Sequence, residues 1–164
     1  MSVDVTVRRA QIGDVPQLVE LNALVQGVHV AAEPTVFKPT RAGEVAAWFT
    51  AGLESGSLLS WVAADRAEVV GYITVLAQQR DAHAFCHARA WWQIDQLGVR
   101  PEWRRRGIAR ALLRAVAAEA GRAGVTQLQL STWSFNAEAL ETWGHLGFEP
   151  QATRFVIDPR QLGA

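Results

Sequence analysis

The sequence has very little cysteine and lysine, and it has no long apolar run. Cys86 is the only cysteine among 164 residues, which excludes an internal disulfide and a zinc site built from several cysteines. Lysine is also scarce, since fifteen of the sixteen basic residues are arginine and Lys38 is the exception. No apolar stretch reaches the ~20 residues of a membrane span, and the first residues lack the apolar core of a secretory signal. We therefore expect a cytoplasmic protein that has no membrane partner.

The charges of the chain balance, which limits its partners. Sixteen basic and sixteen acidic residues give a formal net charge of zero, so a general attraction to nucleic acid is not expected. A nucleic-acid clamp would need a basic stripe extending beyond one loop, and we predict no such partner. Hydrophobic residues make up 49% of the chain, which is enough to bury a sizeable core. We expect a single domain over residues 1–164.

Strand and helix patterns alternate along the chain. Val3, Val5 and Val7 share one side of a period-two segment, and Asp14 precedes a helical pattern that we expect it to cap. Asn136 is expected to cap the last helix in the same way. The alternation predicts a mixed α/β fold with six or seven strands. We expect strands at residues 3–9, 58–64, 68–79, 91–99 and 126–132 with one or two more in 148–158, and helices at 15–25, 41–53, 108–120 and 137–146.

The stretch RRRGIA at residues 104–109 follows an expected strand and opens an expected helix. A helix N-terminus has unpaired N–H groups and the positive end of the helix dipole, which together favour an anion. Gly107 allows close approach to the backbone, and Ala109 keeps the next position nearly as open. Three arginines here repel the positive end of the helix dipole, which is unfavourable unless an anion binds between them. The alternative interpretation is that they simply form a solvated basic start to the helix. The chain lacks G-x-G-x-x-G after a strand, which excludes the dinucleotide-binding motif, and it lacks G-x-x-x-x-G-K-[ST], which excludes the Walker motif. We therefore predict a pyrophosphate site of another type.

These residues resemble the GNAT-type N-acetyltransferase superfamily, in particular its bacterial members. RRRGIA fits the family signature [QR]-x-x-G-x-[GA], and LGVRPEWRRRGIARALLRAV is similar to the strand, loop and helix around it. STWSFNAEALETWGHLGF and VTVRRAQIGDVPQLVELN resemble the family's later strand and helix and its opening strand and helix. The resemblance implies a three-layer fold whose mixed central sheet splays near its middle, with helices on both faces. It also implies transfer of acetyl from acetyl-CoA to a primary amine by direct attack in a ternary complex.

The resemblance further implies where the cofactor lies. The strand at 91–99 would open away from its neighbour after a bulge, most easily at Gly98, leaving backbone groups of Leu97 and Val99 for the pantetheine arm. A free N–H there could also stabilise the oxyanion formed when an amine attacks the thioester. The implied cofactor-binding residues are Leu97, Gly98, Val99, Arg104, Arg105, Arg106, Gly107, Ile108, Ala109, Asn136 and Trp143.

The acid and the base of the reaction are less well marked. Trp143 stands where many family members have a tyrosine that protonates the leaving sulfur; an indole N–H can hold the sulfur or a water but is no practical acid. Trp143 could equally belong to an apolar helix face. For the base we predict Asp95, the only acid on the central strand, on the same side as Gln93, Leu97 and Val99. A structural role for Asp95, with an ordered water as base, is the alternative.

The segment HAFCH contains three residues that bind metals elsewhere. His83, Cys86 and His87 are tightly spaced in an expected loop at 80–90 and have no distant partner, so we predict no metal site. This loop and residues 27–37 would instead flank the pocket of a small-molecule or peptide amine, with shape from the aromatic side chains His29, Phe37, Phe85, Trp91 and Trp92. A non-catalytic acyl-CoA sensor is the alternative function. A homodimer through an edge strand near the C-terminus is possible.

Overall fold

The structure, a computed structural model, describes residues 5–163. The expected position of Val3 in the first strand lies outside these residues. The chain separates into two compact units, Met1–Ser131 and Thr132–Ala164. No helix in the described part is long and apolar enough to span a bilayer.

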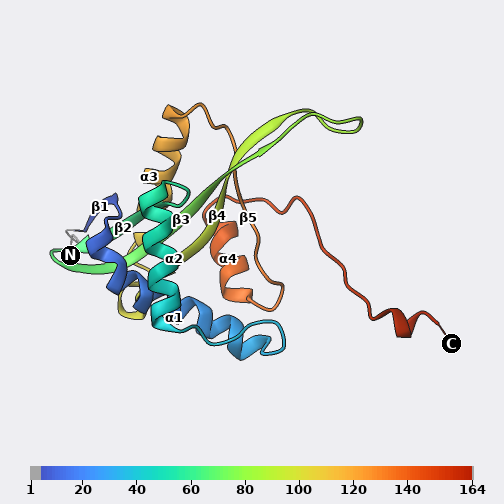
Figure 1. Cartoon of the computed structure of the whole chain (residues 1–164), viewed down its shortest axis with the longest axis horizontal. Coiled ribbons are helices and arrows are strands. Elements are labelled where there is room, and N and C mark those ends of the chain that lie inside the picture. Colours follow the sequence, from blue (N-terminus) through green and yellow to red (C-terminus); the bar gives the residue numbers. More distant parts are fainter. Residues whose placement is uncertain (1–4, 164) are drawn as a thin grey trace. The chain divides into compact units, whose positions relative to one another are not determined.

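The first unit contains a mixed five-stranded sheet whose strands lie in sequence order (Figure 1). Antiparallel pairing joins β1 to β4 in succession, and β5 is parallel to β4. The hairpin between the second and third strands turns at Arg66, whose φ is 54°. The predicted mixed sheet is therefore confirmed. The strands are β1 (Thr6–Arg9), β2 (Leu59–Asp65), β3 (Glu68–Arg80), β4 (Arg89–Val99) and β5 (Leu128–Leu130).

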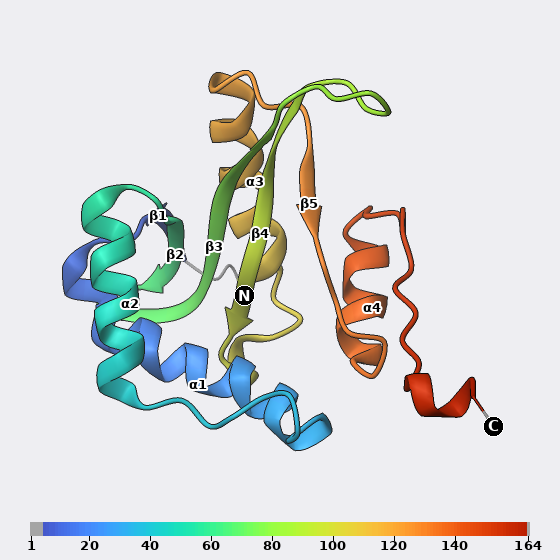
Figure 2. The same cartoon turned by 45° about the vertical axis from the view of Figure 1, so that its right-hand side comes forward.

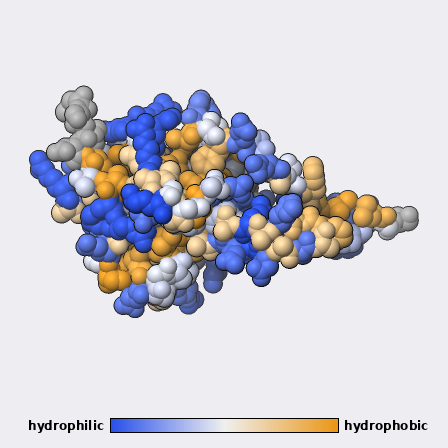
Figure 3. All heavy atoms as spheres, turned by 90° about the horizontal axis from the view of Figure 1, so that it is seen from above, coloured by the Kyte–Doolittle hydropathy of each residue, from blue (hydrophilic) through white to orange (hydrophobic). Residues whose placement is uncertain are grey.

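The expected number of six or seven strands is wrong. Residues 148–158 form no strand, and β5 is shorter than the predicted segment 126–132. A strand forms only when a neighbour satisfies its backbone groups, so alternating apolar residues alone are not sufficient. Phe155 and Val156 are 90% and 97% exposed, and apolar side chains are visible toward the C-terminal end in Figure 3.

Four helices occur where the sequence pattern predicts them. The first of them continues well beyond residue 25, because Gly27 does not end it, and so includes residues expected to form a loop. The helices of the first unit are α1 (Val15–Ala32), α2 (Ala42–Ser55) and α3 (Ile108–Arg122); α4 (Ala137–His145) belongs to the second unit.

Asp14 occupies the N-cap position of α1 without capping the helix through its side chain. Its carboxylate accepts two hydrogen bonds from Arg8, at 2.7 and 2.8 Å, and one from Gln11 N at 2.8 Å. The Arg8 guanidinium lowers the pKa of the Asp14 carboxyl, because these contacts favour the charged form. The prediction that Asp14 caps α1 is therefore wrong, because its carboxylate instead connects Arg8 of β1 to Gln11, before the helix.

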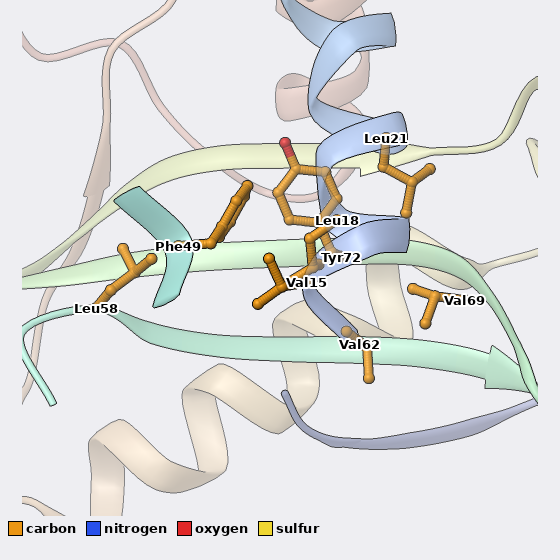
Figure 4. Packing of buried hydrophobic residues seen from close by; sticks show 8 residues of the cluster. All are labelled: Val15, Leu18, Leu21, Phe49, Leu58, Val62, Val69 and Tyr72. Carbon is orange, nitrogen blue, oxygen red and sulfur yellow. The ribbon is translucent and has the colours of Figure 1, made fainter. Parts of the chain in front are cut away.

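Helices cover both faces of the sheet in the first unit, as the resemblance implies. Two neighbouring residues of β3 show the division: a Cβ on Gly71 would lie 2.9 Å from Ile108 of α3, whereas Tyr72 packs with α1 and α2. In Figure 2, α1 and α2 lie on one face and α3 on the other. The core on the α1 and α2 face, drawn in Figure 4, consists of Val15, Leu18, Leu21, Phe49, Leu58, Val62, Val69 and Tyr72.

The face of α3 that meets the sheet is a simple helical stripe. Ile108, Leu112, Val116 and Ala120 recur every four residues and are all buried. This spacing places their side chains on one side of the helix. Because the stripe begins at the first helical residue, packing against the sheet fixes the position of the helix N-terminus.

Candidate active site

The turn between β4 and α3 contains two residues with a left-handed backbone. After the short 3₁₀ helix η2 (Pro101–Trp103), Arg105 has a φ of 59° and Gly107 a φ of 80°. This conformation costs an ordinary residue roughly 1–2 kcal/mol and glycine almost nothing. Gly107 is thus favoured by the turn itself, and its carbonyl accepts a hydrogen bond from Ala111 N at 3.0 Å as the helix begins.

The arginine side chains of this turn are exposed and partly oriented by their neighbours. Arg104 Nε donates to Val99 O at 3.4 Å. The Arg106 guanidinium lies 5.1 Å from the centroid of the Trp103 ring, within the range of a cation–π contact. The turn therefore presents basic groups beside the end of β4.

The N-terminus of α3 has no acid of its own to offset this charge. Its first turn contains no acidic residue, and its N-cap Gly107 has no side chain to accept a hydrogen bond. The N–H groups of Ile108 and Ala109 have no acceptor within the helix because of their position in its first turn. Positive charge, open N–H donors and the helix dipole coincide here, which suits an anion such as a phosphate.

The sheet opens next to this turn. Pairing between β4 and β5 extends only from Trp92 opposite Leu128 to Ile94 opposite Leu130. Pairing between β4 and β3, by contrast, continues to Val99. Beyond Ile94, the edge of β4 that faces β5 therefore has no strand partner among the described residues, which is the predicted splay.

The bulge that accompanies this opening lies at Asp95, not at Gly98. Gln96 pairs with Thr74 and Ile94 with Val75, which leaves Asp95 without a partner in β3. Gly98 is in regular register, and it is small for another reason: a Cβ there would lie 2.7 Å from the Tyr72 ring. The prediction of a bulge at Gly98 is therefore wrong, because close packing accounts for that glycine.

The bulge also changes which side chains of β4 share a face. Gln96 and Gly98 face α1, whereas Val99 lies on the α3 side, near the position of a Cβ on Gly71. Strand alternation places Leu97 with Val99. Gln93 pairs with Leu76 and Leu97 with Ile73, which lie on opposite faces of β3. The prediction that Gln93, Asp95, Leu97 and Val99 all share one side is therefore wrong for Gln93, because the extra residue interrupts the period of two.

Asp95 retains an exposed surface and is nevertheless crowded by protein. Desolvation raises the pKa of the Asp95 carboxyl above its ordinary value, and a hydrogen bond from Gln96 partly opposes that shift. A carboxyl with a raised pKa, beside the open edge of the sheet, is a candidate for accepting a proton in the reaction.

Three polar side chains that sequence reasoning missed form a network beside Asp95. Gln96 Oε1 accepts from Tyr72 Oη at 2.7 Å and from Asn22 Nδ2 at 2.9 Å. Tyr72 is fully buried, and desolvation raises the pKa of its phenol so that it remains a neutral donor. Figure 4 shows its ring within the apolar cluster and its hydroxyl at the edge. The one available sequence signal was the single tyrosine of the chain, which lies among mostly apolar residues.

A cleft of about 240 Å³ lies between α1, α2 and β4 of the first unit. Asn22 and Gln96 line it, so the polar network faces this space. The other polar residues lining it are Gln26, Thr40 and Glu44, and Trp48 adds an aromatic surface.

The aromatic residues predicted to shape an acceptor pocket are dispersed. His29 and Phe37 are in contact, with ring centroids 4.9 Å apart. Trp92 is only 7% exposed and packs near Trp61 at 6.2 Å, so it belongs to the core. Phe85 is 92% exposed in the loop between β3 and β4. None of these five residues lines the cleft.

The loop between β3 and β4 is closed by a short bridge. His83 and Cys86 exchange backbone hydrogen bonds of 3.0 and 3.2 Å, and the thiol of Cys86 is free and exposed. Within residues 5–163, no group of three histidine, cysteine or acidic side chains is arranged to hold a metal ion.

The second unit contains the remaining predicted residues. Asn136 Oδ1 accepts from Ala139 N at 3.1 Å, which confirms Asn136 as the N-cap of α4. Trp143 is half-buried, and its ring lies 5.4 Å from that of Phe148 in an edge-to-face contact.

Comparison with known proteins gives a family match and a shared fold. Residues 26–148 match the model of the acetyltransferase (GNAT) family. No match was found among curated protein sequences.

Three solved structures illustrate the shared fold. A tetramutant of the BH1408 protein from Bacillus halodurans has a TM-score of 0.85 at 22% identity, covering 93% of this chain and 99% of that one. A predicted acetyltransferase with acetyl-CoA from Clostridium acetobutylicum has a TM-score of 0.69 at 16% identity, covering 96% and 97%. The aminoglycoside N-acetyltransferase AAC(6')-Iy in complex with CoA has a TM-score of 0.77 at 17% identity, covering 96% of each chain.

Proposed function

This chain belongs to the acetyltransferase (GNAT) family, and we propose that it transfers an acetyl group from acetyl-CoA to a primary amine. The observation that carries the proposal is the basic turn before α3, which leaves a helix N-terminus without an acid or a cap side chain beside an open strand edge. Acetyl-CoA would supply the thioester whose carbonyl carbon the amine attacks.

The turn would hold the pyrophosphate of the cofactor. Backbone N–H groups of Gly107, Ile108 and Ala109 would donate to phosphate oxygens, where the helix dipole contributes about 0.3–1 kcal/mol. The guanidinium groups of Arg104, Arg105 and Arg106 would add charge-assisted hydrogen bonds of roughly 1.5–3 kcal/mol each where they are desolvated.

The open edge of β4 would hold the pantetheine arm. Backbone groups of the segment that contains Leu97, Gly98 and Val99 lie beyond the last pairing with β5, so they are available for hydrogen bonds to amide groups. An N–H in this segment would also stabilise the oxyanion as the amine attacks. In the second unit, the amide of Asn136 and the ring of Trp143 are the groups that we assign to the same arm and its sulfur.

Asp95 is the base in this proposal. It would accept a proton from the acceptor ammonium, so that the free amine can attack the thioester carbon as the C–S bond breaks. The leaving thiolate must gain a proton, and Trp143 cannot provide it because an indole does not release its N–H proton. We therefore assign that proton to water, with Trp143 as a hydrogen-bond donor.

Asp95→Asn tests this assignment. We expect kcat/KM for amine-dependent release of free thiol to fall by about 10²–10⁴-fold, since general base catalysis contributes that much. Asp95 acts when ionised and its pKa is raised, so wild-type activity should fall with decreasing pH at a pH above the 3.8 of an ordinary aspartate. This fall in activity at low pH should be absent from the pH profile of Asp95→Asn.

Asp81→Asn, in the exposed loop between β3 and β4, is the matched control and should leave the profile unchanged. A protein that binds CoA tightly without turnover, and whose behaviour is the same with Asp95→Asn, would instead be an acyl-CoA sensor.

A further inference from the structure

The cleft between α1, α2 and β4 is small and lies next to the proposed base. Its volume of about 240 Å³ is below the roughly 300–1,000 Å³ of sites that hold drug-sized ligands. Gln96, which hydrogen-bonds Asp95, forms part of its wall. A molecule in the cleft would therefore be a small one, held beside Gln96, which follows Asp95 in β4.

One wall of the cleft contains a buried acceptor that has no donor. Asn22 is 7% exposed, and its Nδ2 is used by Gln96, whereas its Oδ1 has no hydrogen-bond partner. A buried polar atom without a partner is unfavourable, and native structures normally supply a partner such as a ligand or a water. Because Asn22 Oδ1 has almost no accessible surface, it makes this wall polar without being a contact point for a ligand in the cleft.

Unpartnered hydroxyl groups continue from this wall across the sheet. Ser60, Thr74 and Gln96 are direct neighbours on β2, β3 and β4. The hydroxyl oxygens of Ser60 and Thr74 are buried and also lack hydrogen-bond partners. The sheet behind Gln96 is thus polar, but neither hydroxyl lines the cleft, whose polar contacts come from Gln26, Thr40 and Gln96.

Among the described residues that line the cleft, Glu44 is the only charged one. Its nearest basic partner is Arg41, at 3.5 Å, and the two side chains are 60% and 84% exposed. Such a solvated pair is weak, so the carboxylate can still attract a cation. Trp48, which is 43% exposed, offers an aromatic face on which an ammonium group is favourable.

We propose that this cleft binds the acceptor, and that it selects a small primary amine that has one positive charge and no carboxylate or phosphate. The inference rests on the proposed acetyl transfer. The amine is attracted by the carboxylate of Glu44 and lies against the aromatic face of Trp48. An anionic group on the same molecule would meet Glu44 and find no basic residue in the lining of the cleft.

The test compares two acceptors that differ in one charge, glycinamide and glycine. Wild-type kcat/KM should be at least tenfold higher for the amide. Glu44→Gln should reduce this preference to less than threefold, and Glu44→Lys should favour the free acid. Differences in amine basicity cancel, because the ratio is compared between variants. Glu44 is exposed in the first turn of α2, so neither substitution disturbs the core.

Glu54→Gln removes the same charge from the other end of α2, where the residue does not line the cleft, and should keep the wild-type preference. Equal use of both acceptors by the wild type, or an unchanged ratio in Glu44→Gln, would overturn the inference.

Acceptor binding measured without acetyl-CoA distinguishes a failure of this inference from a failure of the proposed acetyl transfer. Calorimetry should detect glycinamide and not glycine, and Glu44→Gln should weaken the amide about tenfold. That result supports the cleft assignment even if no product forms. Absence of glycinamide binding to the wild type would overturn the assignment, whether or not CoA binds.

Discussion

The helices α3 and α4 begin in opposite ways. At the start of α4, the side chain of Asn136 accepts a hydrogen bond from Ala139 N, and Glu138 places an acid in the first turn. At the start of α3, Gly107 provides no side chain, the first turn contains no acid, and three arginines precede it. One helix satisfies its own N-terminus with side chains, and the other begins without a cap side chain or an acid in its first turn.

The difference shows where the fold maintains an unfavourable arrangement. Arginines before a helix N-terminus repel its dipole, and Arg105 has in addition a left-handed backbone. These terms oppose folding. A bound pyrophosphate would offset the repulsion between the arginines and the helix dipole, whereas the backbone strain at Arg105 would remain.

The largest expected effect comes from adding a side chain at the start of α3. Gly107→Val should weaken CoA binding more than 100-fold, about 2.7 kcal/mol, because a β-branched residue obstructs the phosphate and disfavours the φ of 80°. Calorimetry with CoA on folded protein provides the measurement.

Gly107→Asn separates the two causes, because asparagine adopts the left-handed region more readily than other residues. It should still lose most of the affinity through its added side chain. Affinity equal to that of the wild type would show that glycine serves the turn alone.

A smaller effect is expected at the start of α4. Asn136→Ala should lower the free energy of unfolding by about 1 kcal/mol through loss of the cap, as measured by urea denaturation. Asn136→Asp retains the capping oxygen and should keep the stability, but it removes the amide donor assigned to the cofactor arm. We expect its CoA affinity to fall about tenfold, or 1.4 kcal/mol. If the affinity of Asn136→Asp is unchanged, Asn136 is only a cap.

Features determined by local sequence were predicted well. The apolar runs that form β2 and β3 and the turn between them are local properties, as is the change from strand to helix at Gly107. The N-cap at Asn136 is equally local. Such features depend on residues within a few positions of one another, so one sequence is enough to find them.

Features that depend on pairing between distant segments were missed. The bulge at Asp95 exists only in the register of β4 against β3, and nothing in β4 alone marks it. The network joins Asn22 to Gln96, which are 74 residues apart. Phe155, Val156 and Ile157 form a short apolar run as a strand would, but in the described chain they have no partner strand.

The central claim is that the basic turn before α3 binds the pyrophosphate of CoA. Titration of the wild-type protein with CoA should show saturable binding, and Arg105→Ala combined with Arg106→Ala should weaken it at least 100-fold at constant salt. Arg114→Ala, an exposed arginine farther along α3, should not alter it. Absence of heat with both CoA and acetyl-CoA, or an undiminished affinity in the double variant, would contradict the account.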